Sequence, residues 1–367
     1  MLFKRVLWLI AVGAISLAAF GKNLPKIAPV PADPLELVTG SIRNADTPAS
    51  RESALQLLGH ARDSYDFRSA GRGYDLKVSF VVTSAGQTQY DGAWEMEDIF
   101  DPQQGLRWTA TTASGYTTTQ ISSHGIFYRE GTSSIVPLRL QEARAALFGA
   151  IPSTGWIDRD QIRTTTSAFN GHSVTCVLLS SLGNAPSATP GRRWEETEEC
   201  IDPQSGLLMV HSQVPGRYFA YKYSGGPQLA GHAFPSKVTV TEAGRVVSEI
   251  SVDSLTELPA ADPKLFVPTD EMIAGEPASA MAEAQKIWRF VGRGPFTSHA
   301  IAHPVCVFGL VTPSGQIVEA HSLQPSDPNS QAAVQDVEGM NLSYPAPPGA
   351  RPEQHFVFVI EKFISSP

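Results

Sequence analysis

The sequence predicts a mainly β protein, in which a large antiparallel sheet with two helices precedes a small α+β module. Three observations support this fold class. Apolar and polar residues alternate with a period of two over much of 74–268. Turn residues recur there about every 8–12 residues, as in antiparallel sandwiches and barrel-like sheets. The last residues, from about 296, instead follow the order strand, turn, strand, helix, strand.

The N-terminal residues have the features of a secretory signal peptide. Lys4 and Arg5 precede an apolar run over 6–20, and small residues follow. The run is shorter than the roughly 20 residues of a comfortable membrane span. We expect 1–21 to be removed and the protein to be periplasmic or secreted, with an uncleaved N-terminal membrane anchor as the alternative. Residues 22–44 contain four prolines and are expected to form an irregular leader arm.

The first regular element is a helix over 47–66. Thr47 is a suitable N-cap and Pro48 suits the first turn. A second helix, over 138–148, interrupts the strands. The predicted strands cover about 74–82, 90–100, 106–110, 117–123, 125–129, 161–168, 172–181, 193–201, 206–213, 217–223, 236–243 and 245–255. The sheet domain should therefore span 45–268.

The C-terminal part should begin with a linker over 269–295, which is small-residue-rich, acidic and poorly periodic. A short helix is expected within it, over 283–290. The terminal module, 296–367, should contain a strand over 305–311, a turn, a strand over 317–320, a helix over 331–337 and a last strand starting at Phe356.

Cysteine spacing predicts one disulfide. Cys176 and Cys200 fall on what read as successive strands, and an exported chain meets an oxidising environment. The bond would close a loop of about 24 residues and contribute about 3 kcal/mol in the loop-entropy description. Two buried free thiols are the alternative. Cys306 lies in an apolar run and is expected to be a packed thiol.

An acidic stretch precedes Cys200. Glu195, Glu196, Glu198 and Glu199 are expected to form a solvated strand edge that discourages aggregation. A cation-binding patch is the alternative interpretation.

No reaction chemistry is evident in the sequence. GxSxG, HExxH and GxxxxGK[ST] are all absent. His299 and His303 have helical metal-ligand spacing, but flanking prolines disfavour a helix there. The sequence therefore predicts no enzyme, no catalytic residue, no metal and no cofactor. Nucleic acid is not expected as a partner, because the net charge is −8 and no basic run occurs.

Aromatic residues interleave with the strands. Most should be core, but Trp94, Trp108 and Phe127 could line an apolar groove if the sheet is curved and open on one side.

Residues 45–268 resemble the periplasmic lipoprotein-carrier domains of the LolA/LolB type. The matching features are the two helices, the strands from Tyr74 onward, the 202–208 turn (DPQSGLL) and the closing 265–268 segment (LFVP). The resemblance implies one curved antiparallel sheet, an open half-barrel, with a helix plugging its concave side.

Residues 296–364 are similar to the TonB C-terminal domain. The matching residues are 309–311, the Ser314-Gly315 turn, the helix 331–337 and the last strand. This similarity implies a last strand that can pair with an extended peptide, with Phe356, Phe358 and Ile360 as candidate docking residues. Met340 stands where the family usually has an aromatic residue, and no long Pro/Lys-rich spacer precedes the module.

These patterns favour an exported envelope binding or adaptor protein. Its sheet domain would hold an apolar or amphipathic ligand, such as a lipid or a lipidated ligand, and its terminal module would dock an envelope protein partner. A purely structural interaction module, or a component of TonB-type energy coupling, is the alternative.

Overall fold

The computed structural model describes residues 26–27, 41–66, 68, 71–83, 90–132, 136–151, 157, 160–180, 191–275, 285–291, 301–311, 315–342 and 355–365. The predicted signal segment, 1–21, lies outside these residues. Among the described residues, no helix combines the length and the apolar character needed to cross a membrane.

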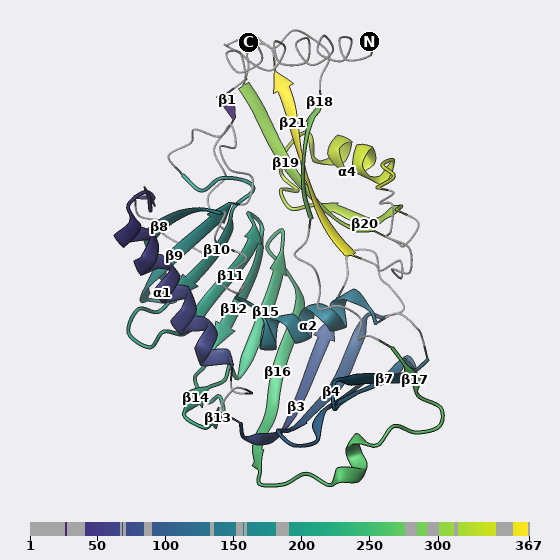
Figure 1. The fold of residues 1–367 in the computed structure, drawn as a ribbon. Coiled ribbons are helices and arrows are strands. Elements are labelled where there is room, and N and C mark those ends of the chain that lie inside the picture. The colour runs from purple at the N-terminus through teal and green to yellow at the C-terminus, as the bar shows by residue number, and fades with distance from the viewer. Residues whose placement is uncertain are drawn as a thin grey trace, which may run out of the picture.

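One open sheet of 14 strands forms most of the protein (Figure 1). Neighbouring strands are antiparallel throughout, in the order β17-β7-β6-β5-β4-β3-β16-β15-β12-β11-β10-β9-β8-β2. The strands are β2 (Arg43–Asn44), β3 (Gly73–Val82), β4 (Gly92–Asp101), β5 (Gly105–Thr112), β6 (Thr117–Ser123), β7 (Ile126–Gly131), β8 (Gln161–Phe169), β9 (His172–Ser180), β10 (Thr197–Ile201), β11 (Leu208–Val214), β12 (Arg217–Lys222), β15 (Lys237–Glu242), β16 (Arg245–Leu258) and β17 (Ile273–Ala274). The sheet is not closed, as predicted.

Strand alternation places the buried apolar residues of a strand on one face of the sheet. In β3, for example, Leu76, Val78, Phe80 and Val82 are buried, while Lys77 and Val81 on the opposite face are exposed. The face that carries these buried residues also carries both long helices, and we call it the concave face. Its largest apolar cluster draws on α1, α2 and most strands of the sheet.

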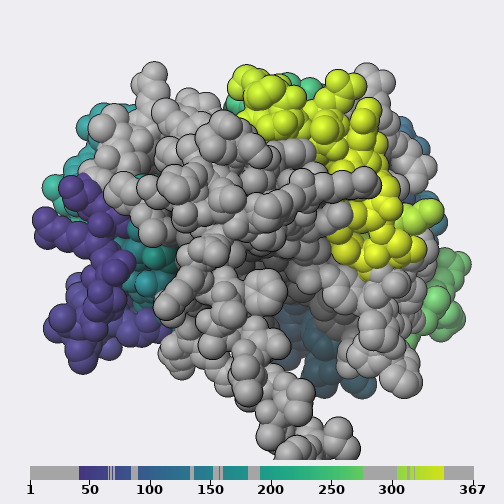
Figure 2. All heavy atoms as spheres, turned by 90° about the horizontal axis from the view of Figure 1, so that it is seen from above, coloured from purple at the N-terminus to yellow at the C-terminus, as the bar shows by residue number. Residues whose placement is uncertain are grey.

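Helix α1 (Pro48–Tyr65) covers one half of the concave face. Its start follows from sequence: Thr47 accepts a hydrogen bond from Ser50 N at 3.1 Å, and Ser50 returns one to the cap backbone. Leu58 and Ala61 are buried in the large apolar cluster, and α1 lies against β8 and β10. Figure 2 shows α1, in purple, and the coloured part of the terminal module, in yellow-green, on opposite sides of the view.

Helix α2 (Leu138–Phe148) crosses the other half of the concave face, above β15, β16, β3 and β4 (Figure 1). Leu140, Ala143 and Leu147 bury fully in the large cluster. A shorter 3-10 helix, η2 (Pro263–Phe266), packs on the opposite face, where Phe266 joins Ile99 and Ile121. A two-stranded sheet, β13 (Gln228–Leu229) with β14 (His232–Ala233), lies between β12 and β15 in the chain.

Turn chemistry is repeated at two points in the sheet. Asp101 Oδ1 accepts from Gln103 N at 2.8 Å, and Asp202 Oδ1 accepts from Gln204 N at 3.0 Å. Gly105 follows the first turn with φ +121°, and a Cβ there would lie 1.9 Å from Ser122 O. The similar DPQxGL segments are therefore explained by one turn type used twice.

In the described residues, the terminal module is a five-stranded sheet covered by helix α4. Strand β19 (Ile301–Val311) pairs with β21 (His355–Ser365), with β20 (Ile317–Ser322) and, in parallel, with β1 (Lys26–Ile27). Strand β18 (Gln285–Val291) pairs in parallel with β21. Helix α4 (Ser330–Glu338) buries Ala333 and Val337 against Val305 and Val307. Cys306 is buried and takes no part in the Cys176–Cys200 disulfide, which agrees with the predicted packed thiol.

Three expectations for the connecting segments need correction. The helix expected over 283–290 is strand β18, because pairing with β21 overrides local preference. The expected linker also contains β17, which extends the large sheet by pairing with β7. Residues of the leader arm expected to be irregular include β1 and β2, each paired with a strand of a different sheet.

Candidate functional site

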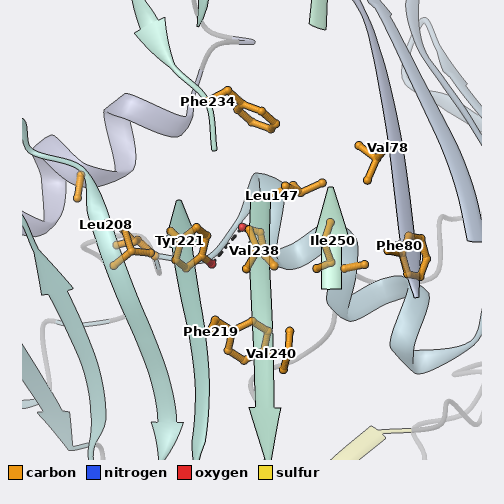
Figure 3. Packing of buried hydrophobic residues seen from close by; sticks show 14 of the residues in the cluster. Val78, Phe80, Leu147, Leu208, Phe219, Tyr221, Phe234, Val238, Val240 and Ile250 are labelled. Atoms are coloured by element: carbon orange, nitrogen blue, oxygen red, sulfur yellow. Dashed lines mark hydrogen bonds between the residues drawn. The ribbon is translucent and has the colours of Figure 1, made fainter. Parts of the chain in front are cut away.

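The concave face is an apolar surface that the strands build in register. Figure 3 shows Val78, Phe80, Ile250, Val238 and Tyr221 from successive strands pointing toward the same space as Leu147 of α2. Tyr221 Oη donates to Ala146 O at 3.1 Å, which ties the helix to the sheet. In this central part the side chains are almost fully buried.

The apolar surface continues beyond the C-terminal end of α2, where it becomes partly exposed. Strand register places Tyr74, Phe100, Leu106, Ser122 and Phe127 in one row across β3 to β7. Tyr74 is buried, and its ring lies 5.6 Å from that of Phe100. Phe100, Leu106 and Phe127 are only partly buried. We call these three residues the apolar row.

The three aromatic residues predicted to line a groove lie on the concave face. Trp94 and Trp108 belong to the packed core, with 1% and 5% exposure. Trp94 stacks on Phe80 with ring centroids 5.4 Å apart. Phe127 alone of the three remains half-buried. The exposed apolar surface therefore lies nearer to Phe127 than to the two tryptophans.

A charged group stands beside the apolar row. The carboxylate of Asp98 on β4 is fully buried, and it accepts from Tyr74 Oη at 2.7 Å. Arg68, just after α1, donates to its Oδ1 at 3.0 Å, and Arg144 of α2 donates to its Oδ2 at 3.0 Å. Arg68 Nε also donates to Tyr74 Oη at 2.7 Å. We call these four residues the aspartate cluster.

Both arginines of the aspartate cluster stack on aromatic rings. The guanidinium carbon of Arg144 lies 4.0 Å from the centroid of Trp108, and that of Arg68 lies 4.3 Å from the centroid of Phe148. Burial and the positive charge of the neighbouring Arg68 lower the pKa of Arg144. Together they outweigh the Asp98 carboxylate, which acts to raise it. Burial and the Asp98 charge raise the pKa of Tyr74, so the phenol stays neutral.

A second charged group lies at the N-terminal end of α2. Glu242 of β15 is fully buried and accepts from Arg139 Nη1 at 2.8 Å and from Arg217 Nε at 2.9 Å. Glu142 of α2 accepts from the same two arginines. His321 Nε2 of β20 lies 2.9 Å from Glu242 Oε2. We call Arg139, Glu142, Arg217 and Glu242 the glutamate cluster.

The glutamate cluster is where the terminal module meets the sheet. The ring of Phe308 on β19 lies 4.8 Å from the guanidinium carbon of Arg217, which is fully buried. Gln324 Nε2 donates to Pro215 O at 3.3 Å. Gly216 comes so close to Leu323 that a Cβ would lie 2.9 Å from the Leu323 side chain. Helix α2 is thus held by ion pairs at both ends, and the terminal module contacts the glutamate cluster at its N-terminal end.

The predicted docking strand is interior to its sheet. Strand β21 pairs with β19 on one side and with β18 on the other. Phe358 and Ile360 have register partners on both strands, and Phe356 has one on β19. In the described residues, β21 is therefore paired on both sides over 357–363. A partner strand could pair with it only after β18 had left. Docking of a partner through Phe356, Phe358 and Ile360 stays a prediction.

The predicted disulfide joins facing residues of β9 and β10. Cys176 and Cys200 are register partners with a Cα–Cα distance of 3.9 Å. His299 lies outside the described residues, and His303 falls in β19, where its side chain is not described.

The acidic stretch beside Cys200 was predicted wrongly as a solvated edge. All four glutamates are at most 3% exposed, because β10 is flanked by β9 and β11. Buried partners compensate the charges: Arg163 pairs with Glu196 at 2.6 Å, Arg192 with Glu198 at 2.9 Å, and His211 lies 2.8 Å from Glu199. Arg163 and His211 come from other strands, which local sequence does not reveal.

Sequence reasoning missed the aspartate cluster, although a signal for it was present. Asp98 occupies an apolar-phase position of β4, between Met96 and Phe100, and Arg144 lies between Leu140 and Leu147 on the apolar side of α2. A charge out of phase with the hydrophobic pattern indicates a buried polar partner. The partners themselves come from three separate segments.

Comparison with known proteins gives structural similarity alone. No protein family matches the sequence, and neither does any curated protein. A putative outer membrane lipoprotein-sorting protein domain from Vibrio parahaemolyticus is similar at 10% identity, over 59% of this chain and 96% of that one, with a TM-score of 0.36. A LolA superfamily protein from Nitrosomonas europaea is similar at 11% identity, over 59% and 97%, with a TM-score of 0.35.

A longer stretch is covered by the complex of MucA and MucB from Pseudomonas aeruginosa, at 12% identity, over 72% of this chain and 82% of that one, with a TM-score of 0.23. The larger part of the chain thus resembles LolA-like domains, at low identity. The similarity of the terminal module to the TonB C-terminal domain stays a prediction.

Proposed function

We propose that the protein is an exported binding protein that holds an apolar or amphipathic ligand on the concave face, at the C-terminal end of α2. One observation carries this proposal: the concave core continues into Phe100, Leu106 and Phe148, which are only partly buried, and strand register places the partly buried Phe127 in the same row. Exposed contiguous apolar surface is costly in water and typically marks a binding surface. The absence of catalytic motifs from the sequence agrees with a binding role.

The polar residues beside this surface also favour an amphipathic ligand as its occupant over a purely apolar contact with another protein surface. Ligand sites combine apolar walls with a few placed polar groups. Here Arg68 and Arg144 stand beside the apolar row, and their side chains are 31% and 22% exposed. A ligand lying on the row could therefore reach both guanidinium groups.

Binding of the neutral, polarity-sensitive dye N-phenyl-1-naphthylamine tests the proposal. We expect a saturable rise in fluorescence with the wild-type protein. Phe127→Asp places a charge in the apolar row and should weaken dye binding by about tenfold or more, since burying an unpaired carboxylate is costly. Phe127 is half-buried, so circular dichroism should show an unchanged fold.

Val81→Asp is the matched control for this experiment. Val81 lies on the opposite face of the same sheet and is 49% exposed. The control should bind the dye like the wild type. Equal loss in both variants, or no saturable binding at all, would refute the proposed site. Whether the terminal module docks an envelope protein stays a prediction.

A further inference from the structure

The aspartate cluster has an excess of positive charge. Arg68 and Arg144 both bind the single carboxylate of Asp98, and Tyr74 contributes a neutral hydroxyl. The cluster therefore carries one net positive charge beside an apolar surface. Holding such a charge partly out of water costs free energy unless a second anion shares it.

Arg144 also has a donor to spare. Its Nε is buried and has no hydrogen-bond partner in the described part of the chain. The ring of Trp108, 4.0 Å from the guanidinium carbon, fixes the plane of the group. A planar guanidinium held in this way suits phosphate or carboxylate recognition, because its N–H groups form a fixed fork.

The positively charged cluster lies close to the apolar row along the strands. Asp98 and Phe100 are two residues apart on one face of β4, and Leu106 and Trp108 are two residues apart on the same face of β5. Two residues of a strand span about 7 Å. A headgroup at the arginines and an acyl chain on the row can thus belong to one molecule.

We infer that Arg144 and Arg68 bind the anionic headgroup, phosphate or carboxylate, of an amphiphile whose apolar chain lies on the apolar row. This inference rests on the proposed function and names its ligand class. The anion would share Arg144 and Arg68 with Asp98 and so offset the net positive charge of the cluster.

Isothermal titration calorimetry with three compounds below their micelle concentrations tests the inference on the full exported protein. Lysophosphatidic acid carries a phosphate and a chain, a monoacylglycerol carries the same chain without charge, and glycerol 3-phosphate carries the headgroup alone. The wild type should bind lysophosphatidic acid about tenfold or more tightly than the monoacylglycerol, from the strength of charge-assisted hydrogen bonds. Glycerol 3-phosphate should not bind at the same concentrations.

Arg144→Gln should remove this preference while keeping the affinity for the monoacylglycerol, which also shows that the variant is folded. Arg107→Gln is the control: Arg107 lies on the opposite face of β5, is 24% exposed and has its own carboxylate, Glu97. It should retain the preference.

Different failures have different meanings. Equal binding of the charged and neutral amphiphiles by the wild type would overturn the headgroup site and leave the proposed function standing. Tight binding of glycerol 3-phosphate would show that the arginines bind a soluble anion, and it would refute their role in binding a lipid headgroup. Loss of both amphiphiles in Arg144→Gln would make Arg144 structural. Binding of neither amphiphile by the wild type would overturn the proposed function as well.

Discussion

Removing the charge of Glu242 gives the sharpest test of how α2 is held in place. Glu242→Gln keeps the shape of the side chain but leaves Arg139 and Arg217 with one carboxylate, that of Glu142. The carboxylate is fully buried and accepts bonds of 2.8 and 2.9 Å from the two arginines. Losing one partner of a buried ion pair costs about 3–5 kcal/mol, so we expect a loss of that size at pH 7.

The loss should depend on pH in a defined direction. Burial alone would raise the pKa of Glu242, but Arg139 and Arg217 outweigh it and hold the pKa well below its usual range. A carboxyl with a lowered folded-state pKa stabilises the protein above its unfolded-state pKa, about 4.3, and loses that contribution as pH falls further. The difference between wild type and Glu242→Gln should therefore be constant from pH 7 to about 5 and shrink at lower pH.

Urea unfolding followed by tryptophan fluorescence measures both quantities. Glu249→Gln is the matched control, because Glu249 also pairs with a neighbouring strand, through Lys237, but is 48% exposed. An exposed pair contributes less than about 1 kcal/mol. A loss below about 1 kcal/mol in Glu242→Gln at pH 7, or one that does not change between pH 5 and 3, would refute the account of the glutamate cluster.

Three further changes test the packing. Replacing Cys176 and Cys200 by serine should cost about 2–5 kcal/mol in urea unfolding, because the chain loses a cross-link. Gly216→Ala should lower the midpoint of thermal unfolding, because φ is +92° and the new Cβ would meet Leu323. Leu140→Ala should cost about 2–5 kcal/mol, because Leu140 is fully buried where α2 meets the sheet.

Each of these changes has an internal control. The cysteine variant should be insensitive to reductant, while the wild type should lose the same stability when reduced. Gly225→Ala shares a positive φ, +73°, but its Cβ would meet nothing within 4 Å, so its loss should be smaller than that of Gly216→Ala. Similar losses at both glycines would mean that the Leu323 contact contributes nothing. A loss below about 1 kcal/mol in Leu140→Ala would show that α2 packs only loosely.

Local sequence was sufficient wherever a local pattern determined the structure. Alternation placed the strands of the large sheet from β3 to β16 but not the short pair β13 and β14, and Thr47 with Pro48 marked the start of α1 within a residue. The Cys176–Cys200 disulfide was predicted from the places of the two cysteines on successive strands. In each case, neighbours in sequence supply the energy that decides the conformation.

Sequence reasoning failed where partners come from distant segments. The buried glutamates before Cys200 depend on Arg163 and His211, which lie on other strands. Strand β18 depends on β21 at the far end of the chain. The aspartate cluster joins the end of α1, β4 and α2, so only its out-of-phase charges were visible. Burial of charge is a long-range property, and periodicity does not report it.

The central claim is that the concave face holds an amphipathic ligand, and one measurement tests it most directly. The chain is exported with its own N-terminal segment, purified without detergent, extracted with organic solvent and examined by mass spectrometry for lipids. We predict an anionic amphiphile in near-stoichiometric amount, which is reduced in Phe127→Asp and retained in Val81→Asp. A clean extract from wild-type protein that also fails to bind added amphiphiles would contradict the account and favour a purely structural role.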